Sequence, residues 1–225
     1  MIMSNVISLT KGEVINLSKI PAIDLSKGGK GLQKVVVGLG WDPVSEMETS
    51  SNETEKKGFF AKLFGSSTGS HSSSAPDIDC DAFAIGLNDG RILNKDDLIY
   101  FGHLQNEDKS IYHTGDNLTG DGDGDDEQII IDLSRVKNDS IVIAVNIYQG
   151  RSRSQHFGML QNAFIRIEDM NTGTELCRYT LDSKYDGYVT VNFGTLVKNG
   201  DEWSFTATGE PSSANSISSF AENYR

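Results

Sequence analysis

The chain has 225 residues and a formal net charge of −12, from 32 acidic and 20 basic side chains. This length is enough for one well-buried domain but not for two of similar size. Nine of the acids fall in two short tracts, residues 77–81 and 116–127, and without them the net charge would be −3. The acidity is therefore local, and because no cluster of Lys and Arg is visible, nucleic acid is excluded as the main partner.

The N-terminal sequence has polar residues through its apolar part and no small-residue cleavage site, so we expect no signal peptide. No apolar run approaches the roughly 20 residues that span a bilayer. Cys80 and Cys177 form no metal-type pair, which favours a reducing compartment. These features predict a cytoplasmic protein.

The first thirty residues contain a short repeat, ISLTKG at 7–12 and IDLSKG at 23–28. We interpret the two copies as a pair of edge strands whose lysines discourage pairing with other chains. A docking role for these lysines is the alternative. The valine-rich segment at 34–39 then predicts the first core strand.

Residues 44–75 are rich in Ser, Thr, Glu and Lys, which predicts a disordered loop insertion within a single domain that spans residues 1–225. The insertion contains a basic and aromatic segment, residues 56–65, with Phe59, Phe60 and Phe64. This segment could bind a membrane surface or a partner, or it could fold back on the domain. Residues 65–69 match G-x-S-x-G, but a hydrolase needs that motif between a strand and a helix.

Short segments rich in β-branched and aromatic residues recur through the rest of the chain, at 82–87, 128–133, 140–148, 163–167, 174–181, 188–193 and 202–208. Turn sequences such as Asn171-Thr172-Gly173 and Asn199-Gly200 separate several of them. Strands at this spacing predict a β-sandwich. Because only residues 216–224 suggest a helix, we expect an all-β fold with a short helical C-terminus.

The two acidic tracts predict a cation site. Carboxylates this close repel one another, and their pKa values would rise unless a positive charge lay among them. Ca²⁺ accepts about 6–8 oxygens in irregular geometry, whereas Mg²⁺ keeps its waters and needs few carboxylates. Alternation along a strand would place Asp77, Asp79 and Asp81 on one face, and the glycines of the second tract allow its backbone to curl. The alternative is two solvated acidic loops.

Two known calcium geometries do not fit the second tract. An EF-hand loop that started at Asp121 would need glycine at Asp126 and glutamate at Asp132, and a strand-like segment follows where a helix is required. A calcium-binding β-helix would need tandem copies of its repeat, and none follow. We therefore predict a site assembled from separate loops at one end of the sandwich.

Five blocks of the sequence together resemble the TerD family of tellurium-resistance proteins: GLGWD at 38–42, DID at 77–79, TGDNLTG at 114–120, GDGDDE at 122–127, and FG at 157–158 with AFIR at 163–166. The resemblance covers nearly the whole chain except residues 44–75. It implies a Ca²⁺-binding β-sandwich encoded among bacterial stress genes linked to tellurite resistance. It also implies a part in membrane-associated stress or phage-defence complexes, with other stress-response or tellurite-resistance proteins as partners.

Carried over to this sequence, the acidic motifs of the family fall on Asp42, Asp77, Asp79, Asp116, Asn117, Asp123, Asp125, Asp126 and Glu127. Asp81 stands where a small residue is commoner in the family, and Asp121 replaces a more usual Glu. Both keep or add charge, so we include them in the predicted ligand set. We expect these residues to hold two Ca²⁺ ions.

The sequence therefore predicts a non-enzymatic Ca²⁺-binding stress-response protein that acts as a binding or scaffold module. We expect it in the cytoplasm, with the inner face of the membrane as an alternative location, and without a small-molecule substrate. A Ca²⁺-dependent membrane binder that uses the insertion and a metal-dependent hydrolase are the alternatives. His103 and His113 could serve as bases in the latter. Arg151, Arg153 and Gln155 lie in a turn-like stretch that could bind an anion or a partner, or could be a solvated loop.

Overall fold

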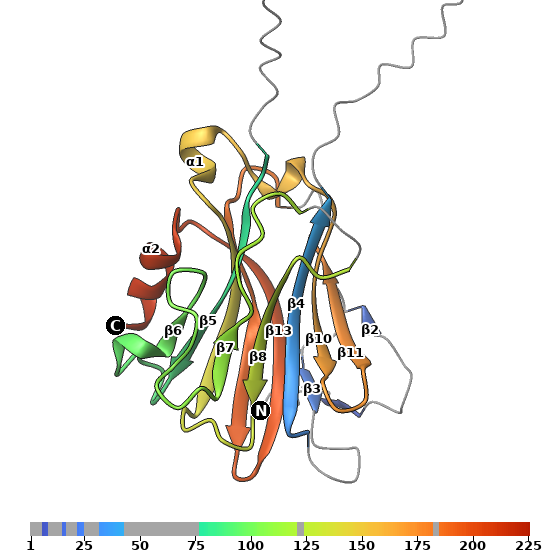
Figure 1. Cartoon of the computed structure of the whole chain (residues 1–225), viewed down its shortest axis with the longest axis vertical. Helices are drawn as coiled ribbons and strands as arrows, with labels where there is room; N and C mark the ends of the chain where they lie inside the picture. The colour runs from blue at the N-terminus through green and yellow to red at the C-terminus, as the bar shows by residue number, and fades with distance from the viewer. Residues whose placement is uncertain are drawn as a thin grey trace, which may run out of the picture. The chain divides into compact units, whose positions relative to one another are not determined.

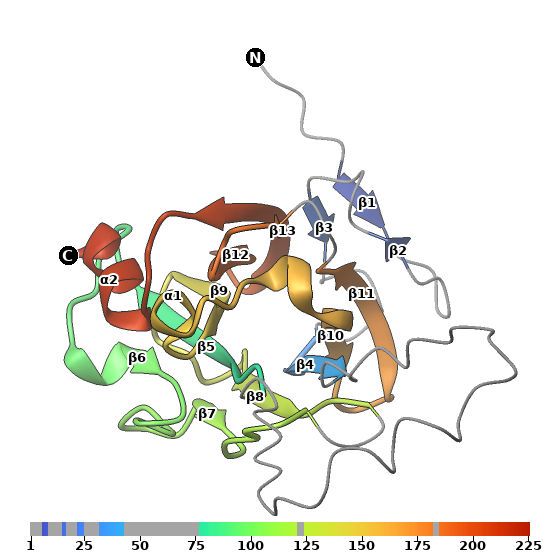
Figure 2. The same ribbon diagram turned by 90° about the horizontal axis from the view of Figure 1, so that it is seen from above.

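The computed structural model describes residues 6–8, 15–16, 22–24, 32–42, 77–120, 124–181 and 185–225, with the backbone alone for the first three segments. Two β-sheets stack against each other (Figures 1 and 2). The predicted insertion at 44–75 lies outside the described residues. Among the described helices, none is long and apolar enough to cross a membrane.

The first sheet has seven strands in the order β1-β3-β13-β12-β9-β5-β6. Their bounds are β1 Val6–Ser8, β3 Ala22–Asp24, β13 Glu202–Ser212, β12 Thr190–Asn199, β9 Ser140–Ile147, β5 Cys80–Leu87 and β6 Leu98–Ile99. All neighbours are antiparallel except β1 and β3, which pair in parallel with Ile7 opposite Ile23. The repeated segments thus pair in register, but β3 also pairs with β13 and is not the edge strand that was expected.

The second sheet has six strands in the order β2-β11-β10-β4-β8-β7. Their bounds are β2 Ile15–Asn16, β11 Thr174–Thr180, β10 Gln161–Asp169, β4 Lys34–Asp42, β8 Glu127–Asp132 and β7 Ile111–His113. Apart from the short strands β1 to β3, each sheet consists of five antiparallel strands. The all-β, sandwich-like fold is confirmed. β6 and β7 were not predicted because two or three residues are too few to show a period.

The core lies between the sheets and follows from alternation along the strands. Val35, Val37 and Leu39 of β4 are fully buried in one cluster with residues of the neighbouring strand β8 and of β5 and β9 in the other sheet. Side chains two positions apart point to the same face of a strand, so each strand contributes every second residue. This burial fixes the register of the strands, because a shift by one residue would turn the apolar set outward.

Strand β5 is buried on both faces, which explains its continuous apolar sequence. Its outer face packs against the C-terminal helix α2, Ile217–Ala221, where the rings of Phe83 and Phe220 meet edge to face at 5.3 Å. Ser216 caps α2, and the short helix η6, Glu222–Tyr224, follows it. The predicted C-terminal helix is confirmed.

Three short helices complete the described fold: η3 Lys95–Asp97, α1 Gly150–Arg153 and η4 Phe157–Met159. α1 is limited to one turn because the residues that flank it, Gln149 and Ser154, have left-handed φ angles of 52° and 57°. α1 lies at the end of the sandwich where β5 begins (Figure 1). This end also carries the acidic residues.

Candidate metal centre

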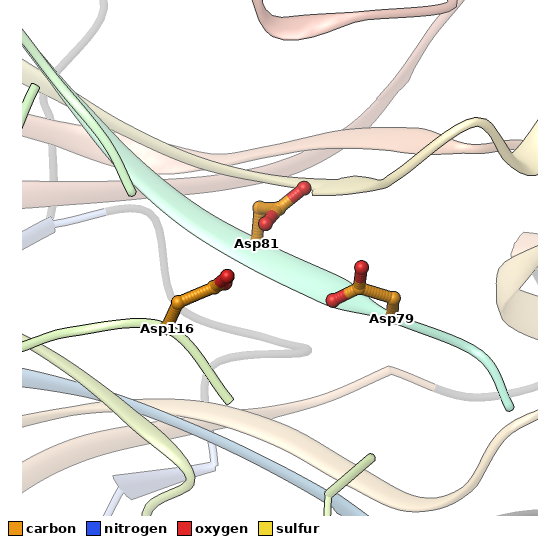
Figure 3. A group of neighbouring side chains, drawn as sticks. All are labelled: Asp79, Asp81 and Asp116. Carbon is orange, nitrogen blue, oxygen red and sulfur yellow. The ribbon is translucent and has the colours of Figure 1, made fainter. Parts of the chain in front are cut away.

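Three aspartates from two separate segments form a compact cluster. Asp79 and Asp81 lie at the start of β5, Asp116 lies in the loop before β8, and one carboxylate oxygen of each is within 4.8 Å of the others. Figure 3 shows the carboxylates of Asp79 and Asp81 on the strand and that of Asp116 on the facing loop, grouped around a common space. Asp79 and Asp81 share a side of the chain because they are two residues apart. The cluster is called the triad below.

The buried oxygens of the triad lack protein partners. Asp79 is 7% exposed and Asp81 is 1% exposed, and within the described part of the chain Asp79 Oδ1 and Asp81 Oδ2 have no hydrogen-bond partner. A buried polar atom without a partner is costly, and a buried charge is costlier still. Asp116 is exposed and leaves the triad open to solvent on one side. The arrangement fits a bound cation that enters from that side.

The raised pKa values of the triad also indicate a cation site. Burial, followed by repulsion from Asp116 and Glu127, raises the pKa of Asp79 to about 6. Burial, followed by repulsion from Glu127, Asp79 and Asp116, raises the pKa of Asp81 to about 9. Without a cation the folded protein would hold a proton on Asp81 at neutral pH, and on Asp79 below about pH 6. A divalent ion would replace those protons.

Glu127, the first residue of β8, joins the triad to the second acidic tract. Its Oε2 accepts from the Ala82 backbone N–H at 2.7 Å, and its Oε1 accepts from that of Asn117 at 3.4 Å. The Nε2 atom of buried His113 lies 3.3 Å from Oε2, while Nδ1 of the same ring accepts from the Gly115 N–H. Since Nδ1 accepts, Nε2 is the ring nitrogen left to carry a proton, and it lies beside Glu127 without an aligned hydrogen bond among the described residues. Burial raises the pKa of Glu127.

The remaining described residues of the second tract bind the protein itself. Both oxygens of Asp126 accept hydrogen bonds, one from the Trp41 backbone N–H at 2.9 Å and one from Asn117 Nδ2 at 3.0 Å. Asn117 Oδ1 accepts from the backbone N–H groups of Thr119 and Gly120. Asp125 pairs with Arg166 and is 2% exposed. These contacts hold the loop that carries Asp116 against β4 and β10.

The other predicted ligands lie elsewhere. Asp77 precedes β5, is exposed and is not part of the triad; its carbonyl accepts from Gln155 Nε2 at 3.3 Å. The carboxylate of Asp42, at the end of β4, accepts from Asn162 Nδ2. Asp121 and Asp123 lie outside the described residues. Arg166 was not predicted as part of the site, and its only signal was the AFIR block. His113 was considered only as a base for the hydrolase alternative and not as a partner of Glu127.

The donor set of the triad consists of oxygens, which favours a hard cation. Cys80 lies between Asp79 and Asp81 in the sequence, but its side chain belongs to the core on the opposite side of the strand. Burial raises the pKa of the Cys80 thiol well above its ordinary value, so it is no thiolate ligand. Soft-metal chemistry is therefore not supported at this site.

Fold and cluster together define a β-sandwich protein with a candidate site for a hard metal ion. The model of the TerD domain matches residues 13–224, so the chain belongs to the TerD domain family. The family resemblance noted from the sequence blocks is thereby confirmed.

Several relatives cover most of the chain. It is 46% identical over 198 residues to stress response protein SCP2 of Bacillus subtilis (strain 168), with 87% of this chain and 92% of the relative covered. It is 34% identical over 198 residues to tellurium resistance protein TerD of Serratia marcescens, with 87% and 90% covered. A solved structure of a TerD homologue from Streptomyces coelicolor A3(2) superposes with a TM-score of 0.57 at 19% identity, covering 81% of this chain and 92% of that one, which supports the fold.

Proposed function

We propose that this protein is a Ca²⁺-binding stress-response protein of the tellurite-resistance type, which acts as a binding or scaffold module and not as a catalyst. The observation that carries the proposal is the pair of buried oxygens Asp79 Oδ1 and Asp81 Oδ2, which have no hydrogen-bond partner among the described residues and belong to a triad completed by Asp116. The names of the relatives refer to stress and resistance and to no reaction.

Ca²⁺ fits the triad better than Mg²⁺ does. Three carboxylates supply up to six oxygens, two carboxylates from a strand and one from a loop. Ca²⁺ tolerates such an irregular set of ligands. In this proposal the triad holds the first ion and Glu127 borders it. The other predicted residues hold a second ion or frame the loop: Asp42, Asp77, Asn117, Asp121, Asp123, Asp125 and Asp126.

The partners of a Ca²⁺-bound, non-catalytic module would be other stress-response or tellurite-resistance proteins. It would bind them in the cytoplasm or at the inner face of the membrane. Binding of Ca²⁺ would offset most of the negative charge of the triad and tie the loop that carries Asp116 to β5. A partner that contacts this end of the sandwich would then bind in a Ca²⁺-dependent way.

Titration calorimetry of the metal-depleted chain with Ca²⁺ and, separately, Mg²⁺ tests the proposal. We expect Ca²⁺ to bind with the higher affinity, and a Ca²⁺ concentration of 100 times the Kd to stabilise the fold by about 2.7 kcal/mol. An unchanged melting temperature in excess Ca²⁺, together with no heat of binding, would reject it. Hydrolysis of a phosphoester that is lost in Asp81→Asn would support the hydrolase alternative instead.

A further inference from the structure

Arg153 of α1 is held beside the triad through Tyr148. The backbone N–H of Tyr148 donates to the carbonyl of Asp79 at 2.8 Å, and the Arg153 guanidinium lies over the Tyr148 ring, 5.4 Å from its centroid. The ring of Phe101 packs edge to face against Tyr148 and fixes it further. Arg153 is close enough to Asp79 for its charge to oppose the rise in the pKa of that carboxyl.

The guanidinium of Arg153 is available for a ligand. Arg153 is half-buried, and no described carboxylate or carbonyl accepts a hydrogen bond from its side chain. Stacking on an aromatic ring occupies the face of a guanidinium and leaves its N–H edges free. Arg151, two residues away in the same helix, differs because its Nε donates to Asn215 Oδ1 at 3.0 Å.

The triad also leaves an ion incompletely surrounded by protein. Ca²⁺ takes about 6–8 oxygens, and the described residues of the triad offer three carboxylates, one of them exposed. The exposed Asp116 leaves room for further ligands on the solvent side, and Arg153 is close enough for its charge to act on Asp79. An oxyanion there would meet two positive groups, the ion and the guanidinium.

We infer that Ca²⁺ in the triad and the Arg153 guanidinium together bind a phosphate ester, which places one oxygen on the ion and others on the guanidinium edge. This inference rests on the proposed Ca²⁺ site. A phosphate monoester has three free oxygens and can serve both groups, and its geometry matches the arginine fork. A carboxylate has only two. The ester can be a soluble metabolite or the headgroup of a lipid, since both present the same group.

Calorimetry with glycerol phosphate, which remains soluble with Ca²⁺, tests the inference on the full chain. We expect glycerol phosphate to bind in saturating Ca²⁺ and not in chelator. Glycerol phosphate should also tighten Ca²⁺ binding by the factor by which Ca²⁺ tightens glycerol phosphate binding, because coupling is reciprocal. Arg153→Leu should weaken glycerol phosphate binding at least about tenfold, since it removes charge-assisted hydrogen bonds. Arg153→Lys, which keeps the charge and loses the fork, should be intermediate.

Arg151→Leu is the matched control, with the same change of charge in the same helix. It should bind glycerol phosphate like the unmodified chain. Arg153→Leu should bind Ca²⁺ alone at least as tightly as before, because a nearby positive charge is gone; weaker Ca²⁺ binding would indicate a structural role and overturn the inference. Equal losses in the two variants, or binding of neither glycerol phosphate nor phosphatidic acid by the Ca²⁺-loaded chain, would also overturn it.

Two further measurements distinguish a lipid headgroup from a soluble ester, and the proposed Ca²⁺ site from the inferred phosphate ester site. Vesicles of phosphatidylcholine with about one-fifth phosphatidic acid, compared with phosphatidylcholine alone, show whether a lipid headgroup is bound as well, and Arg153→Leu should abolish that binding. Ca²⁺ titration without any anion reports on the proposed function alone. If Ca²⁺ does not bind, the proposed function fails and this inference fails with it; if Ca²⁺ binds and neither ester does, only this inference fails.

Discussion

Arg166 holds Asp125 in a two-point ion pair, with Nε and Nη2 each 2.7 Å from a different carboxylate oxygen. The two side chains are 17% and 2% exposed. Gly38 of β4 lies directly against this carboxylate, because a Cβ added there would stand 2.2 Å from Asp125 Oδ2. The pair therefore ties the second acidic tract to β10, and β4 can lie close by only because residue 38 is glycine.

Replacement of Arg166 tests whether Asp125 anchors the loop or is itself a Ca²⁺ ligand. If Asp125 anchors the loop, Arg166→Leu should weaken Ca²⁺ binding about tenfold or more and lower the free energy of unfolding by on the order of 3 kcal/mol, as for other broken buried pairs. If Asp125 is a ligand, loss of the competing positive charge should tighten Ca²⁺ binding. Calorimetry and denaturant unfolding measure both quantities.

Arg178→Leu provides the control for that experiment. Arg178 lies on the neighbouring strand β11 and pairs with Glu175, not with Asp125. We expect little change in Ca²⁺ affinity, because the altered charge does not touch the acidic tract. Similar effects of the two variants would mean that the sheet, and not the Arg166 contact, sets the affinity.

Asp81→Asn should have opposite effects on the two states of the protein. Without Ca²⁺ it removes a buried group that burial and neighbouring carboxylates disfavour, so the melting temperature should rise. With Ca²⁺ it removes a ligand, so the gain in melting temperature on Ca²⁺ addition should disappear. Asp201→Asn, an exposed change in the turn between β12 and β13, should alter neither measurement. A lower melting temperature of metal-free Asp81→Asn would contradict the repulsion described for the triad.

The stability of the metal-free protein should fall as pH rises. The pKa values of Asp79 and Asp81, about 6 and about 9, exceed the ordinary value of 3.8, so the folded state holds more protons than the unfolded state above pH 3.8. Their contribution is therefore full below that pH and is lost by about pH 6 and pH 9 respectively. The gain from Ca²⁺, which displaces these protons, should grow over the same window.

Melting temperatures at pH 5, 6.5 and 8 measure this trend, with protein stripped on a chelating resin because the affinity of soluble chelators itself depends on pH. A Ca²⁺-induced gain that shrinks from acid to neutral pH would contradict the prediction. In metal-free Asp81→Asn the melting temperature should change less with pH than in the metal-free unmodified chain.

The two tryptophans offer a spectroscopic test of where Ca²⁺ binds. Trp41 Nε1 donates to the carbonyl of Ile78, next to Asp79, and Gly120 packs against the same indole. Trp203 Nε1 donates to the carbonyl of Leu133 instead. We expect a Ca²⁺-dependent fluorescence change that Trp203→Phe keeps and Trp41→Phe loses. Trp41→Phe should also destabilise the fold by about 1–3 kcal/mol, since it leaves a buried carbonyl without its donor. The reverse pattern would place the ion away from the triad.

Several features could be read from local sequence because their physical cause is local. Alternating or continuous apolar segments predicted the long strands of both sheets, and the expected Asn199-Gly200 turn follows β12, although β12 extends to Asn199 and the predicted strand ended at residue 193. The limits of β13 were missed because its last residues, up to Ser212, include a glycine and a proline that are atypical of strands. α1 was missed because a single helical turn between two left-handed residues has no periodic signal.

The sequence by itself determined that this is an all-β protein and that its acids are concentrated in two tracts, since composition and strand period are local properties. Five sequence blocks also resembled the TerD family, which the match to the family model confirmed. Only the tertiary structure decided how those acids are shared. Stacking of the sheet that contains β5 on the sheet that contains β8 brings Asp116 to Asp79 and Asp81, and the pairing of β4 with β8 and β10 gives Asp125 to Arg166. Charges of the same type in one tract thus acquire different partners, because contacts between strands depend on register and not on distance along the chain.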